Sequence, residues 1–176
     1  MAGLRKGKCY RIMERPYTRK SKYKSKGYIK AFPNHKISRF EMGERAKSYE
    51  FKVKLVSKGT LQVRQNSIES ARMVVNRKLQ DVLGTNYYLK INVFPHHALR
   101  ENKMLGGAHA DRLQTGMAHS FGKVVNTAAQ VKRGKEVFTA WVFKAGLDQA
   151  KLALKSAGPR LAGQFSIEVE SVSGAK

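Results

Sequence analysis

One segment constrains the fold of this chain most, the stretch PHHALRENKMLGGAHADRLQTG from Pro95 to Gly116. It mixes charged, amide and glycine residues without a helical or an alternating apolar period, and Gly106-Gly107 frees the backbone further. A segment of this length without regular structure is uncommon inside a compact domain, and where it occurs it is usually functional or disordered. We therefore expect a basic arm, with a tail reaching Lys123, that projects from a folded body toward a polyanion.

The charge of the whole chain indicates the same kind of partner. Its 35 Lys and Arg outnumber 12 Asp and Glu, which gives a formal net charge of +23. Such an imbalance is typical of proteins that bind nucleic acid or an anionic membrane, and it says nothing about the fold. No stretch is long and apolar enough to span a bilayer, and residues 1–11 contain no apolar signal segment. We expect no membrane contact, and a location in the cytosol or the nucleus.

The cations are densest near the N-terminus, between Arg15 and Lys30, where Tyr17, Tyr23 and Tyr28 are interspersed among them. In water this segment cannot offset its backbone entropy by burying apolar surface. On RNA its cations would contact phosphates and its tyrosines would stack on bases or ribose. We expect residues 1–48 to form a basic RNA-binding extension; a solvated tail used for solubility or nuclear import is the alternative. The candidate contacts are Arg5, Lys6, Arg11, Arg15, Tyr17, Arg19, Lys20, Lys22, Tyr23, Lys24, Lys26, Lys36 and Arg39.

Residues 49–172 are expected to form one α+β domain, a mixed sheet with two helices on one face, from which loop 100–118 projects. Alternating apolar residues predict strands at 51–55, 61–64, 87–94 and 165–170. The run 137–143 is apolar on both faces and predicts a central strand. Residues 124–131 predict a strand that is poorly defined in its middle. The tetrapeptide Lys132–Lys135 predicts a hairpin turn.

Two helices are expected, one opening near Asn66 and one spanning roughly residues 147–157. Asn66 and Glu69 have the spacing of a capping box, and Gly84 closes the first helix. The apolar spacing places Ile68, Ala71, Val75, Leu79 and Val82 on the buried face of that helix. The predicted core consists of Phe51, Val53, Leu55, Ile68, Val75, Leu79, Ile91, Val93, Val137, Trp141, Leu154, Phe165 and Ile167.

Residues for catalysis or metal binding are few. His96-His97, His109 and His119 have no Cys or carboxylate at ligand spacing, and the single Cys9 is expected to be a reduced thiol. No phosphate-binding glycine loop stands between a strand and a helix, and no nucleophile elbow is present. We therefore expect neither a metal nor a cofactor. An RNA-modifying or RNA-cleaving enzyme with the arm as a lid would have to use His109, Asp111 and Arg112.

The arm also carries a family resemblance. Residues 93–117, VFPHHALRENKMLGGAHADRLQTGM, and Phe121-Gly-Lys123 closely resemble the archaeal and eukaryotic relatives of bacterial ribosomal protein L-sixteen, the "ten-e" family. The sequences RPYTR at 15–19 and RQNSIESAR at 64–72 resemble the same family, so the likeness covers nearly the whole chain. The chain ends soon after the last predicted strand, without the extension typical of eukaryotic members, and therefore resembles the archaeal form.

The resemblance implies a structural large-subunit ribosomal protein with an α/β hammerhead-type fold, no catalytic group and no tendency to form homo-oligomers. It implies contacts with large-subunit rRNA near the small five-S rRNA, with neighbouring ribosomal proteins and, through the arm, with aminoacyl-site tRNA near the peptidyl transferase centre. A free-standing RNA chaperone or DNA-compacting protein is a further alternative. The arm residues implied to lie near tRNA are Arg100, Asn102, Lys103, Met104, Gly106, Gly107, His109, Arg112, Gln114 and Lys123.

Overall fold

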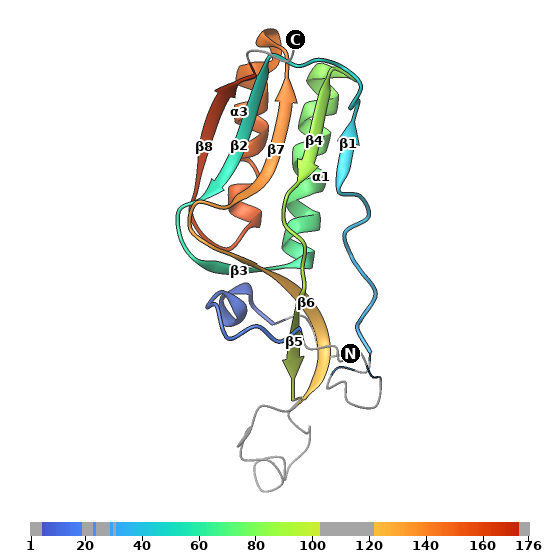
Figure 1. Ribbon diagram of the computed structural model, residues 1–176, viewed down its shortest axis with the longest axis vertical. Helices are drawn as coiled ribbons and strands as arrows, with labels where there is room; N and C mark the ends of the chain where they lie inside the picture. The colour runs from blue at the N-terminus through green and yellow to red at the C-terminus, as the bar shows by residue number, and fades with distance from the viewer. Residues whose placement is uncertain (1–4, 19–22, 24–28, 30, 103–121, 173–176) are drawn as a thin grey trace, which may run out of the picture.

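The strands form two antiparallel sheets that follow one another along the long axis of the molecule (Figure 1). The computed structural model describes residues 5–18, 23, 29, 31–102 and 122–172. The five-stranded sheet has the order β1 (Glu41–Gly43), β4 (Tyr87–Ile91), β7 (Glu136–Val142), β2 (Phe51–Ser57), β8 (Phe165–Ser171). The three-stranded sheet has the order β3 (Leu61–Arg64), β6 (Lys123–Val131), β5 (His97–Glu101).

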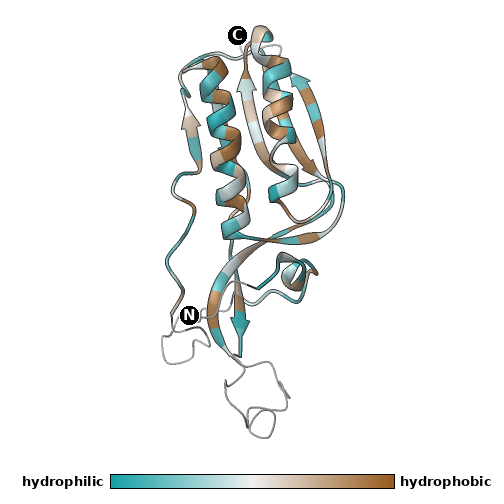
Figure 2. Ribbon diagram, turned by 180° about the vertical axis from the view of Figure 1, so that it is seen from behind, coloured by the Kyte–Doolittle hydropathy of each residue, from teal (hydrophilic) through white to brown (hydrophobic). Residues whose placement is uncertain are grey.

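The helices α1 (Gln65–Leu83) and α3 (Leu147–Lys155) lie over the same face of the five-stranded sheet, as the view from the helix side shows (Figure 2). Ile68, Ala71, Val75 and Leu79 of α1 are fully buried, because a spacing of three or four residues keeps them on one side of the helix. The predicted α+β class, with two helices on one face, is confirmed. Short 3₁₀ turns occur at Gly7–Tyr10, Lys144–Gly146 and Gly158–Arg160.

The core lies between these helices and the five-stranded sheet. β7 occupies the middle of that sheet, as its apolar run predicted. Nine predicted core residues are buried, and Phe51, Phe165 and Ile167 pack against the core while partly exposed. Trp141 was predicted wrongly. It is only half-buried on the sheet face away from the helices, where its ring lies 4.8 Å from that of Tyr88 and near Lys52.

On the face of the five-stranded sheet away from the helices, lysines and glutamates pair with one another. Lys54 is only 9% exposed, which is rare for a lysine unless its charge is paired. Its Nζ lies 2.9 Å from a carboxylate oxygen of Glu136 and also contacts Glu170 on β8. These hydrogen bonds, first to Glu170 and then to Glu136, raise the pKa of the Lys54 ammonium. The strands of this sheet carry three lysines, Lys52, Lys54 and Lys90, against four glutamates, Glu41, Glu136, Glu168 and Glu170.

The start of α1 differs from the predicted capping box. The helix begins at Gln65, after the extended Arg64, and no side chain caps it. Asn66 lies inside the first turn, and Glu69 instead pairs with Arg72 at 2.7 Å and accepts a hydrogen bond from Ser38. The capping prediction was wrong because the spacing of two residue types cannot show which tertiary partners compete for their side chains. Val82, predicted to be buried, is 57% exposed.

The stretch predicted to be irregular contains a strand. β5 begins two residues after Pro95 and pairs with β6 in an antiparallel register that brings Glu101 opposite Lys123. β6 is continuous from Lys123 to Val131, including the middle that its sequence left undefined. The local pattern is weak because β5 has only five residues and its pairing partner lies more than 20 residues away. The predicted loop 100–118 therefore begins too early, because Arg100 and Glu101 belong to β5.

The turn at Lys132–Lys135 does not join paired neighbours, because β6 and β7 belong to different sheets. It instead binds Ser57 at the end of β2: Ser57 donates its N–H to the Lys135 carbonyl at 3.1 Å and accepts one from Gly134 at 2.8 Å. Gly134 has a φ of 79°, which favours glycine there. The hairpin prediction was wrong, and the turn fastens together the two connections that cross between the sheets.

Candidate nucleic-acid interface

The N-terminal residues 5–18 lie against the three-stranded sheet and supply hydrogen-bond partners to both of its edges. Gln62 of β3 donates its backbone N–H to the Arg11 carbonyl at 2.9 Å. On the opposite edge, Ala98 of β5 donates its N–H to the Tyr17 carbonyl, also at 2.9 Å. An edge strand presents unpaired backbone N–H and C=O groups. The segment supplies a partner to one such group on each edge of this small sheet. We call this sheet together with residues 5–18 the strapped sheet.

The middle of the strap is held to the central strand. Gln130 of β6 donates a side-chain N–H to the Glu14 carbonyl at 2.9 Å and another to the Gln62 side chain at 3.2 Å. Gln62 is buried and also donates to the Tyr10 carbonyl at 3.1 Å. Arg11, Glu14 and Tyr17 thus follow the strand order β3, β6, β5. The segment crosses the sheet on its backbone hydrogen bonds, which leaves the cationic side chains of Lys6, Arg11 and Arg15 exposed.

The first turn of the strap is fixed by charged and aromatic groups. Arg64 donates to the Arg5 carbonyl at 2.9 Å, and its guanidinium lies 5.5 Å from the centre of the Tyr10 ring. The Tyr10 hydroxyl donates to Glu101 of β5, and the Arg5 guanidinium lies 3.7 Å from the same carboxylate. Glu101 therefore ties the strap to the base of the predicted arm.

The end of the strap is fixed by His97 and Arg100 of β5. Tyr17 donates its backbone N–H to Nδ1 of His97 at 2.8 Å, and the Arg100 guanidinium lies 3.7 Å from the centre of the Tyr17 ring. His97 is 5% exposed, and this burial lowers the pKa of its imidazole. The neutral ring can accept the Tyr17 N–H, so it holds the strap at neutral pH. Tyr17 and Arg100, both predicted to contact RNA, contact each other.

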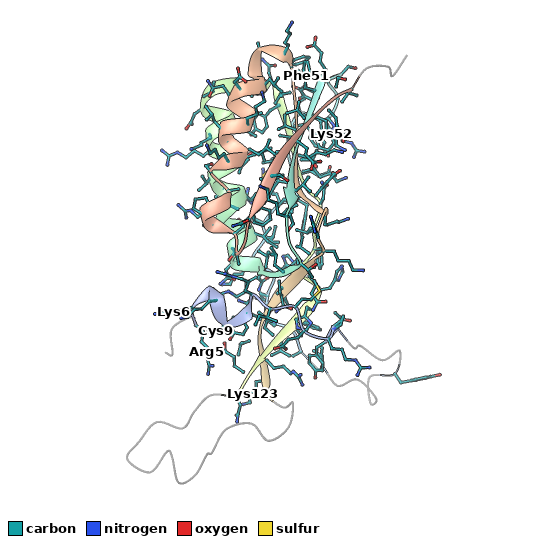
Figure 3. The ribbon with its side chains drawn as sticks, turned by 90° about the vertical axis from the view of Figure 1, so that its left-hand side faces the viewer. Arg5, Lys6, Cys9, Phe51, Lys52 and Lys123 are labelled. Carbon is teal, nitrogen blue, oxygen red and sulfur yellow. The ribbon has the colours of Figure 1, made fainter. Side chains whose placement is uncertain are left out.

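The strapped sheet has a strongly positive charge. It carries eight cations against two carboxylates, those of Glu14 and Glu101. Arg5 and Lys6 lie at the same end of the molecule as Lys123, and Phe51 and Lys52 lie at the opposite end (Figure 3). The eight cations are Arg5, Lys6, Lys8, Arg11, Arg15, Arg64, Arg100 and Lys123.

The other predicted contact residues are not all brought together there. The exposed Lys36 and Arg39 lie beside α1: Lys36 donates its backbone N–H to the buried Gln65, and Arg39 lines a hollow of about 730 Å³ between β1 and α1. Tyr23 is exposed, and Asn102 follows β5 directly. The remaining candidates fall outside the described residues: Arg19, Lys20, Lys22, Lys24, Lys26, Lys103, Met104, Gly106, Gly107, His109, Arg112 and Gln114.

Sequence reasoning missed Lys8, Arg64, Gln62 and Gln130 as parts of this surface. Lys8 belongs to the same basic run as Arg5 and Arg11, so the charge pattern could have identified it. Arg64 was noted as the end of a strand and as the start of the family motif at 64–72, but not as part of a basic surface. The two glutamines carry no sequence signal, because their role depends on backbone carbonyls of a distant segment.

Within the described ranges, no group of three or more His, Cys, Asp or Glu side chains could hold a metal ion. The exposed Cys9 lies in the first 3₁₀ turn. Neither α1 nor any other helix of the described chain has the length and apolar character needed to cross a membrane.

Comparison with known proteins gives one consistent result. The family model described as Ribosomal protein L16p/L10e matches residues 13–168. A large ribosomal subunit protein uL16 from Metallosphaera sedula is 43% identical over 162 residues, covering 90% of this chain and 89% of that protein. The proteins of the same name from Methanoculleus marisnigri and Archaeoglobus fulgidus are 42% and 39% identical, covering 84% and 93% of this chain and 85% and 91% of their own lengths.

The family model spans the three-stranded sheet, both helices, nearly all of the five-stranded sheet and the last part of the strap. The family consists of structural ribosomal proteins and not of enzymes, and its archaeal members work in the cytoplasm as parts of the large subunit. The chain therefore belongs to the ribosomal protein L16p/L10e family, in its archaeal form.

Proposed function

We propose that this structural protein of the large ribosomal subunit binds large-subunit rRNA through the strapped sheet and residues 19–48. We further propose that the predicted arm, taken now to begin after β5, reaches toward the peptidyl transferase centre and helps to position aminoacyl-site tRNA. Neighbouring ribosomal proteins and the region of the small five-S rRNA complete the proposed surroundings. The observation that carries this proposal is the concentration of eight cations on the strapped sheet, five of them on the strap that covers both sheet edges.

The geometry supports a contact through phosphates. Arg11, Arg15 and Lys6 are exposed, and the strap that carries them is tied to all three strands by backbone and glutamine hydrogen bonds. Cations on an ordered scaffold lose less conformational freedom on binding than cations on a free tail. Such contacts neutralise phosphates and release counterions, so their strength depends on salt.

The base of the predicted arm is formed by the ends of β5 and β6. Their ends, Glu101 and Lys123, lie opposite each other at the end of the molecule away from the helices (Figure 1). Whatever the strapped sheet binds therefore lies near the base of the arm. This arrangement favours a protein that is anchored by one basic surface and extends a second one to a further nucleic acid.

Neutralising Arg5, Arg11 and Arg15 to glutamine tests the rRNA part of the proposal. Binding to a large-subunit rRNA fragment should weaken, and the slope of log affinity against log salt should flatten by roughly 0.7–0.9 for each phosphate that the protein no longer neutralises. A control variant removes three exposed helix cations, Arg77, Lys78 and Lys155, and should keep the slope. Equal slopes for both variants would contradict the proposal.

The arm requires a separate test on ribosomes. Replacing residues 103–121 by a short Gly/Ser link should slow or weaken acceptance of tRNA into the aminoacyl site. Once tRNA is in place, the bond-forming step with a small aminoacyl acceptor should run near its normal rate. A loss of roughly a hundredfold or more in that step, the low end for general acid–base groups, would mean that the arm is catalytic.

Sedimentation distinguishes this proposal from a free-standing RNA chaperone. The full chain should remain with large subunits through a high-salt wash, because a structural component is held by many contacts at once. Quantitative release into the free pool under that wash would favour the chaperone.

A further inference from the structure

A small pocket opens where the two sheets meet, between the connection from β4 to β5 and the segment that precedes β1. Its volume is about 290 Å³, and ring side chains of Phe94, His35 and His96 line it together with Thr127 of β6. This volume lies at the lower end of the roughly 300–1,000 Å³ of small-ligand sites. It therefore suits one flat group and not a large ligand.

The rings form an exposed cluster. The ring of Phe94 lies 5.4 Å from that of Phe40 in a stacked arrangement, 5.0 Å from His35 and 4.6 Å from His96. Phe94 is nevertheless 46% exposed, which is unusual for a phenylalanine held among other rings. Phe40 packs against the core, so it supports Phe94 from behind. The cluster offers a pre-formed surface on which another ring could stack.

Thr127 adds an unpaired polar group to this surface. Its residue is 6% exposed, and its hydroxyl Oγ1 has no hydrogen-bond partner among the described residues. Burying a hydroxyl without a partner costs free energy, so such groups are rare unless a ligand or water completes them. Thr127 lines the pocket, but its Oγ1 atom is almost completely shielded, so a bound group with a polar edge would supply the missing partner once the Thr127 side chain turns its hydroxyl toward the pocket.

We propose that this pocket receives one unpaired nucleobase of rRNA, stacked on Phe94 and hydrogen-bonded to the hydroxyl of Thr127. The proposal rests on the proposed rRNA binding and adds a site to it. A base is flat and carries donors and acceptors on its edge, and single-stranded RNA is recognised by stacking on aromatic side chains combined with such edge contacts.

The surrounding charge favours RNA over an acidic or neutral peptide. The pocket lining contains no Asp or Glu among the described residues, and Lys36 and Arg39 follow His35 in the same segment. The phosphates on either side of an inserted base would therefore meet cations. An aromatic side chain of a neighbouring protein could stack on Phe94, but it would leave the Thr127 hydroxyl unpaired unless it also carried a polar group.

The test uses the full chain and short single-stranded RNAs that carry one 2-aminopurine, whose fluorescence falls when the base stacks. Phe94→Leu keeps the apolar bulk and removes the aromatic face. It should reduce both the quenching and the affinity, by roughly 5- to 150-fold, the range expected for one base stacked on an aromatic ring. The salt slope should stay unchanged, because the variant keeps every cation that contacts phosphate.

Thr127→Val provides a second variant with opposite effects on stability and binding. Removing an unpaired buried hydroxyl should leave the thermal midpoint of the free protein unchanged or higher. RNA affinity should nevertheless fall, because the base loses its hydrogen bond. This variant keeps the proposal testable if Phe94→Leu disturbs the fold.

The possible outcomes separate this proposal from the broader function. Normal affinity and quenching in both variants, with the salt slope still flattened by the Arg5, Arg11 and Arg15 substitutions, would overturn the pocket and leave rRNA binding intact. Absence of salt-dependent RNA binding by the wild-type chain would overturn both. Weaker retention on large subunits, with normal binding to the short RNAs, would assign the pocket to a protein partner and overturn the nucleobase proposal.

Discussion

The two sheets of this molecule use charge in opposite ways. The five-stranded sheet pairs its lysines with glutamates, as Lys54 does with Glu136 and Glu170, and buries its other face under helices. The strapped sheet carries a large excess of cations, and much of its cohesion comes from backbone hydrogen bonds to residues 5–18. The five-stranded sheet is stabilised by contacts within the protein, whereas the strapped sheet has an excess of cations that only a partner could neutralise. A basic surface, which we propose binds rRNA, is thus attached to a body that pairs its own charges.

The largest expected effect is on the body. Leu79 is fully buried between α1 and the sheet, so Leu79→Ala should destabilise the protein by about 2–5 kcal/mol through reduced burial and a residual cavity. Urea unfolding of the free chain measures this change. Val82→Ala, at an exposed position of the same helix, is the matched control and should change stability by less than about 0.5 kcal/mol. Similar losses for the two variants would show that the face assignment of α1 is wrong.

The next effect concerns the junction between the regions. Gln65 is 1% exposed; its side-chain amide nitrogen donates to Asn126 of β6 at 2.7 Å, and its side-chain amide oxygen accepts the Lys36 backbone N–H at 3.0 Å. Gln65→Ala should cost about 1–3 kcal/mol, because it leaves buried polar groups without partners.

A double-mutant cycle with Asn126→Ala should give a coupling of roughly 0.5–3 kcal/mol. A coupling indistinguishable from zero would mean that the hydrogen bond between Gln65 and Asn126 does not help to join α1 to the strapped sheet.

A third effect is pH-dependent and concerns Glu69. Its hydrogen bonds with Arg72 lower the pKa of this carboxyl below the ordinary value of 4.5, despite an opposing contribution from burial. A carboxyl with a lowered folded pKa contributes stability above its unfolded pKa, and this contribution is lost as the pH falls through the folded value. Glu69→Gln should therefore cost roughly 1 kcal/mol at pH 7 and little at the acid end.

Unfolding free energies measured at a series of pH values between neutral and strongly acidic conditions test this expectation. Asp81→Asn, in the exposed pair with Arg77, is the control and should show little pH-dependent loss. A constant difference between Glu69→Gln and wild type at every pH would rule out a role for its ionised form.

The smallest effect is expected from the arm. Replacing residues 103–121 by a Gly/Ser link that still joins β5 to β6 should leave the thermal midpoint nearly unchanged, because the predicted core includes none of these residues and the closure entropy of a connection changes by only ~0.6 kcal/mol per doubling of its length. Calorimetry on the free chain measures the midpoint. A fall as large as that of Leu79→Ala would mean that the arm is part of the body's fold.

Much of the body was predictable, because the spacing of apolar residues within a helix or strand indicates which of its faces is buried. The spacing of Ile68, Val75 and Leu79 identified the buried side of α1, and the doubly apolar run 137–143 identified the central strand. The same reasoning was wrong for Val82, at the end of the helix, and for Trp141, on the open sheet face. Periodicity shows which residues share a face, but it cannot show how far the covering layer extends.

The candidate interface was predictable in composition and only partly in structure. The charge run indicated a nucleic-acid surface that includes Arg5, Arg11 and Arg15. The strap itself could not be predicted, because it depends on Gln62 and Gln130 meeting carbonyls more than 50 residues away. A residue's hydrogen-bond partner at that separation leaves no trace in local periodicity.

By itself, the sequence determined the excess of cations, the apolar faces of α1 and the centre of the large sheet, because each depends on residue type and on spacing within one segment. Its motifs also sufficed to recognise the family. Only the tertiary structure decided that β5 exists, that residues 5–18 cross a second sheet, and that Phe94 and Thr127 share a pocket. These features need partners far apart along the chain, and only folding brings such partners together.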